Sequence, residues 1–288
     1  MVPAYSPRPV DCGVLAMNNN EQTPLAGQQH RPYSISVVMI VKDEVENLQI
    51  SLPAVADWVD EIIVLDSGSN DESKSVAEKY GAKWFVNTDW QGFGKQKQLA
   101  QSYARGDWIL ALDADEAVSP ELKESILSVS KDKPGDKVYG FRRIDYIGRY
   151  CIDNPKWILP LKTYWRLYPN HFTYNDNNVH ESLDISRASK TLSLQGYLNH
   201  HTAFDYSHWL NKRVKYAIIW AEEKHSHHKK TNIFSIIGHS FWAFVKTFII
   251  EGRFLLGGKG FLYSSLFAQY TFNKYVVLYD LNRRGQKE

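Results

Sequence analysis

The chain has 288 residues, 43% of them hydrophobic and 23% charged, so it is long enough for one large domain or for one domain with an appendage. This composition excludes intrinsic disorder and a collagen-like fibre. Two cysteines, Cys12 and Cys151, are too few for a disulfide scaffold and favour a reducing compartment. Aromatic side chains make up 14% of the residues, more than an ordinary core needs. The fold therefore depends on a buried core, and the surplus of rings points to a second role.

The net charge of +2 hides a division of the chain at Asp205. Residues 1–204 contain 21 Lys and Arg against 26 Asp and Glu, whereas residues 205–288 contain 13 against 6. The C-terminal part is thus basic as well as aromatic. That combination suits an anionic membrane surface, and it also suits nucleic acid or an acidic partner subunit.

Neither end of the chain predicts a membrane-spanning helix or a signal peptide. The two longest apolar runs, residues 231–245 and 260–273, stop at Lys246 and Lys274, short of the roughly 18 uncharged residues that a span needs. Residues 1–33 are rich in proline and asparagine and lack the apolar centre of a signal peptide. We expect them to form a flexible leader.

Four short apolar runs alternate with helical segments after the leader. The predicted strands cover residues 35–41, 61–65, 83–86 and 108–112, with helices at about 46–56, 70–80 and 94–104 between them. Ser69 or Asn70 is the expected cap of the second helix. Alternation of this kind predicts an α/β fold with a mostly parallel sheet and helices on both faces.

The elements after residue 116 are less regular. A helix is predicted to start at Ser119, which can cap it, with Pro120 in its first turn. Strands are expected at 138–143 and 163–168, then a polar turn at 175–180 and a helix from 207 that frays over 222–230. Aromatic-rich helical segments follow, and we expect breaks at Gly252, Gly257-Gly258 and Gly260.

Carboxylates follow three of the four predicted parallel strands. Asp43 comes after the first strand, Asp66 after the second, and Asp113 with Asp115 after the fourth. Ligands of such sheets bind outside the carboxyl ends of the strands, and one or two carboxylates suffice to hold a divalent cation that also binds phosphates. Asp43 alone could be a helix cap, and an Asp-x-Asp pair could be a solvated turn. Three strand ends with the same feature favour a metal and phosphate site.

Four segments of the chain resemble the nucleotide-sugar-binding half of family 2 glycosyltransferases, which have the Rossmann-like GT-A fold. They are residues 35–44 (ISVVMIVKDE), 61–71 (EIIVLDSGSND), 94–100 (GKQKQLA) and 106–116 (GDWILALDADE). Within the family the chain is most similar to bacterial lipopolysaccharide inner-core β-glucosyltransferases, in which a Val-His-Glu segment and a basic aromatic tail follow.

The resemblance implies a metal-dependent, inverting hexosyltransferase. It would transfer glucose from UDP-glucose to a lipopolysaccharide core or another lipid-linked saccharide, with Mn²⁺ or Mg²⁺ as cofactor and no nucleic acid partner. Residues 34–204 would form the GT-A nucleotide-sugar-binding and catalytic domain. Residues 205–288 would hold the enzyme on the cytoplasmic face of the inner membrane.

The resemblance also implies roles for five residues of the donor site. Asp43 and Asp66 would hold the base and ribose of the nucleotide, and Lys97 falls where the family places a basic residue near it. Asp113 would contact ribose or metal, and Asp115 would coordinate the metal ion that bridges the two phosphates. For Lys97 the alternative is a solvated helix face.

The acceptor side is expected at the Val-His-Glu segment. An inverting transfer needs a base that deprotonates the acceptor hydroxyl. Glu181 is our candidate, and His180 competes because its ordinary pKa lies nearer neutral pH. A capping glutamate beside a core histidine is the structural alternative. Arg166, in a predicted strand, could reach the diphosphate or an anionic acceptor, or it could pair with a carboxylate at the edge of the core.

Two histidine clusters are not counted as sites. His200-His201 lacks a cysteine or carboxylate at ligand spacing. The histidines at 225, 227 and 228 lie at the lysine-rich end of a predicted helix, where solvated side chains are the simpler interpretation.

The basic tail from Ile233 onward predicts interfacial helices, because its rings suit the headgroup level of a bilayer and its cations suit lipid phosphates. An ordinary core or a dimer interface is the alternative. For the whole chain, we weigh a glycosyltransferase of another envelope polysaccharide, a nucleotidyltransferase and a non-catalytic sugar-nucleotide-binding protein as rivals. A nucleotidyltransferase would have a glycine-rich loop after the first strand, and residues 41–44 contain no glycine.

Overall fold

The computed structural model describes residues 32–153, 162–176 and 181–284. Its first half alternates strands and helices as predicted. The elements are β1 (Ile35–Val41), α1 (Val45–Ser51), β2 (Glu61–Asp66), α2 (Ser73–Lys79), β3 (Lys83–Val86), α3 (Phe93–Ser102) and β4 (Trp108–Ala111). All of the predicted leader except its last two residues lies outside the described residues.

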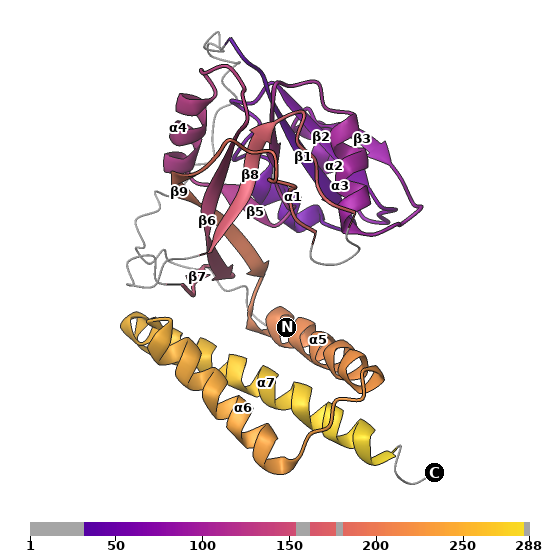
Figure 1. The fold of residues 1–288 in the computed structure, drawn as a ribbon, viewed down its shortest axis with the longest axis vertical. Helices are drawn as coiled ribbons and strands as arrows, with labels where there is room; N and C mark the ends of the chain where they lie inside the picture. The colour runs from indigo at the N-terminus through magenta and orange to yellow at the C-terminus, as the bar shows by residue number, and fades with distance from the viewer. Residues whose placement is uncertain (1–31, 154–161, 177–180, 285–288) are drawn as a thin grey trace, which may run out of the picture. The chain divides into compact units, whose positions relative to one another are not determined.

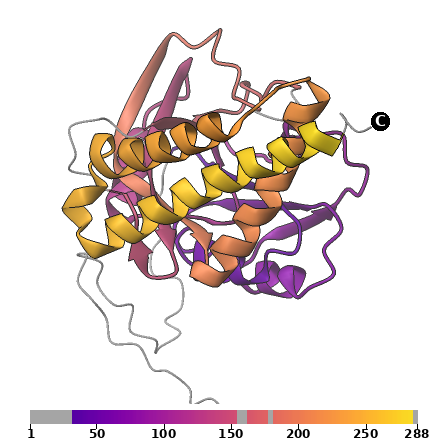
Figure 2. The ribbon, with the colours of Figure 1, turned by 90° about the horizontal axis from the view of Figure 1, so that it is seen from below.

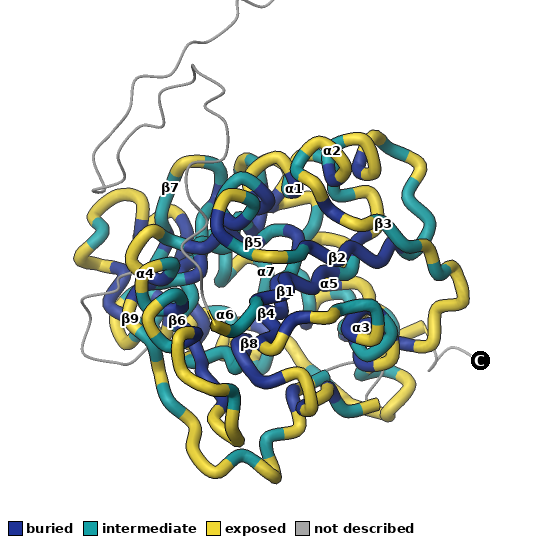
Figure 3. Tube along the Cα trace, turned by 90° about the horizontal axis from the view of Figure 1, so that it is seen from above, coloured by how far each residue is buried: buried dark blue, intermediate teal, exposed yellow. Residues whose placement is uncertain are grey.

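Successive residues of a strand point to opposite faces of the sheet. The strands carry apolar residues on both faces, and helices cover both. On one face, Val37 and Met39 of β1 pack with Leu48 of α1. On the other face, Val38 of β1 packs with Ala100 of α3. Figure 3 shows β1, β2 and β4 as buried backbone in the middle of the molecule. The predicted α/β architecture is confirmed.

The sheet continues beyond the parallel half in the order β3-β2-β1-β4-β8-β6-β9-β5, and β7 pairs with β6 (Figure 1). Pairing is parallel from β3 to β4 and again between β6 and β9, and antiparallel elsewhere. The later strands are β5 (Glu116–Val118), β6 (Lys137–Ile147), β7 (Tyr150–Cys151), β8 (Thr163–Pro169) and β9 (Lys190–Ala203).

The 14-residue strand β9 has no counterpart in the predicted elements. Its alternation of apolar and polar residues is interrupted at Gly196, which has φ +89°. A Cβ added at this position would lie 2.3 Å from the Leu122 backbone nitrogen, so the close approach of α4 (Pro120–Val129) requires glycine. The glycine that lets β9 pack on α4 also interrupts the alternation of apolar and polar residues by which a strand is predicted from sequence.

Helix starts were predicted with mixed success. Ser119 caps α4 as expected, because its hydroxyl accepts from the Leu122 N–H at 3.2 Å. The expected cap of α2 at Ser69 or Asn70 is wrong, since that helix begins only at Ser73 and has no side-chain cap. Ser69 instead serves the loop after β2.

The tail consists of α5 (Tyr206–Ser226), α6 (Ile233–Val245), a π-helical turn at Lys246–Ile250, a 3-10 turn at Arg253–Leu256 and α7 (Gly258–Arg284). The breaks at Gly252 and Gly257 are as expected. Gly260 does not break the chain but lies inside α7, against the Arg253 carbonyl.

One helical run exceeds the length expected from the sequence. The helix of α6 continues through Lys246, so that Ile233–Ile250 forms 18 residues of mean hydropathy 1.6, of which 17% is buried. By length and composition alone it could cross a membrane. The expectation of no such run is therefore corrected: one lysine near its end does not stop the helix.

The tail packs onto the sheet through a third cluster of buried side chains. Ile147 and Ile152 of the β6–β7 region meet Trp209 of α5 and Tyr263 of α7. Arg253 is buried at the same place, and its Nε donates to the Ile152 carbonyl at 2.7 Å. The described residues of the sheet and the tail accordingly belong to one compact unit.

Candidate functional site

The carboxylates predicted at the strand ends lie on one edge of the sheet. β1 pairs in parallel with β2 on one side and β4 on the other, with Val41 opposite Asp66. The chain segments that follow these three strands therefore leave the sheet in the same direction. Asp43, Asp66, Asp113 and Asp115 are brought to this edge by topology, although the first and the last of them are 72 residues apart along the chain.

Asp43 and Asp66 are joined by the loop after β2. The Asp66 carboxylate is buried and accepts from the Ser69 N–H at 3.0 Å and its hydroxyl at 2.6 Å. Asp43 donates its own N–H to the Ser69 hydroxyl and accepts from the Asn70 N–H at 2.7 Å. Asp43 has φ +55°, a left-handed conformation that is uncommon outside glycine. The two aspartates thus fix a polar loop at the carboxyl end of β1 and β2.

A cavity of about 440 Å³ opens beside this loop. Its size lies within the range of small-molecule sites. Trp90 and Phe93 contribute an edge-to-face ring pair with centroids 4.8 Å apart, and both rings are exposed. The lining is completed by Ile40, Val41, Lys42, Glu44, Ser67 and Thr88. Apolar and aromatic walls with a few polar groups can hold a planar heterocycle.

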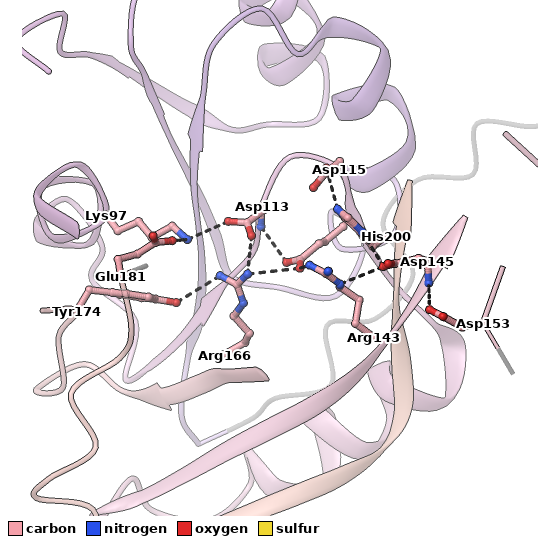
Figure 4. A network of polar contacts seen from close by, with 11 residues as sticks. Lys97, Asp113, Asp115, Arg143, Asp145, Asp153, Arg166, Tyr174, Glu181 and His200 are labelled. Atoms are coloured by element: carbon pink, nitrogen blue, oxygen red, sulfur yellow. Dashed lines mark hydrogen bonds and ion pairs between the residues drawn. The ribbon is translucent and has the colours of Figure 1, made fainter. Parts of the chain in front are cut away.

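A chain of ion pairs runs from Glu181 into the sheet (Figure 4). Lys97 of α3 lies between two carboxylates, with its Nζ 2.9 Å from Glu181 and 3.0 Å from Asp113. Arg166 of β8 donates to the other oxygen of Asp113 at 2.5 Å, and its Nη2 lies 3.4 Å from Glu116. Lys97 and Arg166 are each 7% exposed. Of the two alternatives predicted for Arg166, its geometry shows the pairing with carboxylates, and a contact with the diphosphate or an anionic acceptor stays a prediction.

The buried cations keep Asp113 ionised. Burial alone would raise the pKa of the Asp113 carboxyl, but Arg166 and Lys97 outweigh it and hold that pKa well below its ordinary value. Burial opposes the charge of Arg166 as well, yet Asp113 and Glu116 raise its pKa well above the ordinary value. For the fully buried Glu116, desolvation prevails and the pKa is raised. Asp113 therefore presents a permanent negative charge whose two oxygens are already engaged.

Asp115 has a different partner, which the sequence analysis set aside. The Nε2 of His200 lies 3.0 Å from the Asp115 carboxylate, and its Nδ1 lies 2.8 Å from Asp145. Burial lowers the pKa of His200, but its hydrogen bonds to Asp115 and Asp145 outweigh this effect and raise the pKa to about 9. No carboxylate is near His200 in sequence, and only the pairing of β9 with β5 and β6 brings it to the site.

Asp115 and His200 could hold a divalent cation only after His200, whose raised pKa keeps the ring protonated between Asp115 and Asp145, gives up its Nε2 proton. A carboxylate oxygen and an imidazole nitrogen are ordinary ligands of Mn²⁺, and two protein ligands leave positions for phosphate oxygens. Asp145 on the second ring nitrogen is the partner that usually orients a ligating histidine. Within the described part of the chain, no group of three or more His, Cys, Asp or Glu side chains gathers to hold a metal. Any ion here would depend on the substrate for its remaining ligands.

The predicted acceptor residues are only partly visible. Glu181 is described, and its carboxylate is partly buried against Lys97. His180 lies outside the described residues. Of the predicted set, the structure thus joins Lys97, Asp113, Arg166 and Glu181 in one network, and it places Asp115 with His200 and Asp43 with Asp66 beside it.

Two further residues of the network were missed at the level of sequence. Glu116 sits in the buried strand β5, and Asp145 lies in β6 beside Arg143, 3.2 Å away. The sequence signals for both were weak, because Glu116 directly follows Asp115 and Asp145 follows two arginines just beyond the predicted strand. Neither position reveals its partner until the strands are paired.

This chain is similar to several known proteins. The sequence model described as glycosyl transferase family 2 matches residues 36–192. An uncharacterized glycosyltransferase of Rickettsia prowazekii is 30% identical over 261 residues, which cover 88% of this chain and 89% of the relative. The lipopolysaccharide core biosynthesis glycosyltransferase LpsC of Rhizobium meliloti is 24% identical over 76% of this chain and 83% of its own. Among solved structures, TarS of S. aureus in complex with UDP covers 88% of this chain and 92% of its own, with 15% identity and a TM-score of 0.46.

Proposed function

The chain belongs to glycosyltransferase family 2, and from this premise we propose that it transfers a hexose, glucose in the first instance, from a UDP-sugar to a saccharide on a lipid carrier. The observation that carries the proposal is the continuous ion network from Glu181 through Lys97 to Asp113 at the carboxyl ends of the strands. If Glu181 is the base and Asp113 belongs to the donor site, only the Lys97 side chain separates the two.

The cavity beside the loop of Asp43 and Asp66 is the proposed place of the nucleoside. Its ring pair, Trp90 and Phe93, offers apolar surface to a base, while the loop offers polar groups to the ribose. The diphosphate would then extend toward Asp115 and His200. These two residues would hold Mn²⁺ or Mg²⁺, which when bound would offset the negative charge that develops on the departing diphosphate.

Glu181 is the proposed base of the transfer. Its carboxylate would take the proton of the acceptor hydroxyl while that oxygen forms a bond to the anomeric carbon and the bond to the diphosphate breaks, releasing UDP. Lys97, 2.9 Å from Glu181, orients this carboxylate before the acceptor arrives. Attack from the face opposite the diphosphate inverts the anomeric configuration.

The proposed acceptor is a lipopolysaccharide core or another envelope glycan on a lipid. This proposal is supported by the similarity to a lipopolysaccharide core glycosyltransferase and by the exposed apolar residues of α6. Phe234 is 86% exposed and Phe241 is 68% exposed. We place the enzyme at the cytoplasmic face of the membrane, with the basic and aromatic tail against the lipid.

The test is a donor panel with Mn²⁺ or Mg²⁺ and extracted lipid acceptors, read as UDP release and as sugar transfer. We expect Glu181→Gln to lower kcat by roughly 10² to 10⁴ with little change in the KM for the donor, because the base acts on the acceptor. Asp115→Ala should instead weaken metal binding, measured by calorimetry. Glu124→Gln, an exposed glutamate on α4, is the control. Wild-type rates in both site variants would refute the assignment.

A further inference from the structure

Three cations in the tail lie over aromatic rings between α5 and α7. The Lys274 Nζ is 4.2 Å from the centroid of Trp220 and 5.2 Å from that of Tyr270. The Lys229 Nζ lies over the same Trp220 ring at 5.5 Å. The Arg213 guanidinium shares the Tyr270 ring, at 5.2 Å. These residues, Arg213, Lys229 and Lys274, are named the tail cation cluster.

No carboxylate neutralises the tail cation cluster. Among the described residues, none of its three cations forms an ion pair. The nearby acidic side chains are engaged elsewhere, since Glu223 pairs with Lys224 at 2.7 Å and Asp280 with Arg284 at 2.6 Å. Partial burial and repulsion from Lys229, Lys224 and Arg213 lower the pKa of Lys274. The cluster therefore has an excess of positive charge held close together.

The cluster is built into the fold rather than spread over a flexible surface. Tyr275 of α7 is buried, stacks on His239 of α6 at 4.3 Å and lies under the Lys229 ammonium at 5.5 Å. Asn282 of α7 donates to the Lys229 carbonyl at 3.2 Å, which fixes the connection between α5 and α6. Figure 2 shows α6 and α7 running side by side, as their contacts require.

The exposed apolar side of α6 begins four residues after Lys229. The side chains that face outward recur at helical spacing, and they are Ile233, Phe234, Ile237, Phe241 and Trp242, each at least 56% exposed. A row of apolar groups with cations at its end is the arrangement that interfacial helices use at a bilayer. An anion that reaches the cluster while α6 contacts lipid would come from the headgroup layer.

We propose that the tail cation cluster binds the phosphate of anionic lipid headgroups. Ammonium and guanidinium groups suit phosphate oxygens, and the absence of ion-paired carboxylates among the described residues leaves the three cations available for them. The contacts with the Trp220 and Tyr270 rings restrict the three cationic side chains, so that less conformational entropy is lost when phosphate binds. The proposal rests on the membrane docking proposed above and adds a chemical preference to it.

The test compares vesicles of phosphatidylcholine that carry their negative charge as phosphatidylglycerol or as oleate, matched in surface potential. Binding is measured by flotation of the full chain. Wild type should favour phosphatidylglycerol over oleate, and Lys229→Gln with Lys274→Gln should weaken binding to phosphatidylglycerol by roughly thirtyfold. Lys274→Arg, which keeps the charge, should retain the preference. Lys215→Gln removes a cation from an exposed position of α5 and is the matched control.

Each outcome decides the proposal. Equal binding to the two anionic vesicles, or an unchanged preference in the double variant, overturns it. Selective loss of flotation in millimolar inorganic phosphate, at ionic strength matched with sodium chloride, shows a site for free phosphate and overturns it too. UDP release measured without vesicles reports separately on the glycosyltransferase activity. If the wild-type chain floats with none of the vesicles, the membrane docking on which the proposal rests is removed. Thermal denaturation verifies that the variants are folded.

Discussion

At the scale of single residues, the site is dominated by charges that are buried in opposite pairs. Arg166 is 7% exposed and meets Glu116, which is fully buried, as well as Asp113. Two charges in such a place are stable only together, because removing one leaves the other without either water or a partner. The same residues that would prepare the proposed donor site thus constrain the fold.

Replacing Arg166 by Met should therefore destabilise the protein by about 3 kcal/mol, since Asp113 and Glu116 would lose the cation that they share and the buried Glu116 would keep only Arg143, at 3.7 Å. Adding Glu116→Gln to the same chain should recover part of this loss, because the buried charge is then gone. The measurement is the free energy of unfolding in urea. Arg105→Met, at an exposed position, should change it by less than about 0.5 kcal/mol. Additive effects of Arg166→Met and Glu116→Gln would contradict this account.

At the scale of elements, β9 decides the geometry of the site. It pairs with β5 and β6 together, and in doing so it brings His200 opposite both Glu116 and Asp145. The strand reaches this position by passing α4 at Gly196, where the backbones approach too closely for any side chain. A glycine distant from the chemistry therefore controls where a candidate metal ligand lies.

Gly196→Ala should lower the thermal midpoint by several degrees, because it combines a φ of +89° with a Cβ placed 2.3 Å from the Leu122 nitrogen. The matched control is Gly81→Ala. That glycine has φ +76° with nothing within 4 Å of an added Cβ, so it carries the conformational cost without the clash. Equal midpoints for the two variants would mean that β9 can move away from α4.

At the scale of the whole described molecule, the tail is joined to the site by consecutive contacts. Arg253 donates to Asp153 at 2.5 Å, and the other oxygen of Asp153 accepts from the Asp145 N–H at 2.8 Å. Asp145 in turn holds His200, the partner of Asp115. The surface proposed to contact lipid and the proposed metal site thus belong to one packed body, which suits an enzyme whose acceptor is anchored beside it.

Replacing Phe241 and Trp242 by Asp tests the role of the apolar side of α6. Both rings are more than half exposed, so their loss should leave the free energy of unfolding almost unchanged. Vesicle binding by flotation should fall more than tenfold, since each ring contributes about 2 kcal/mol of transfer free energy. Ile50→Asp, on α1 and 37% exposed, is the control. If flotation stays the same while sedimentation shows a dimer becoming a monomer, α6 is a protein interface instead.

Local pattern was sufficient for much of this protein. Buried β-branched runs, a serine cap and helical spacing depend on near neighbours in the chain, so the sequence by itself determined β1 to β4 to within a few residues and the start of α4. The same regularity placed Asp43, Asp66, Asp113 and Asp115 on one edge, because parallel strands end together.

Only the tertiary structure decided the partners of those aspartates. His200, Glu116 and Asp145 come from strands whose order in the sheet does not follow the chain, and their pairing depends on contacts 50 to 85 residues apart. The same holds for the tail cations, because the folded structure determines whether a carboxylate lies close enough to pair with each of them. Sequence spacing reports which groups a short segment presents, whereas burial and charge pairing are set by which segments meet.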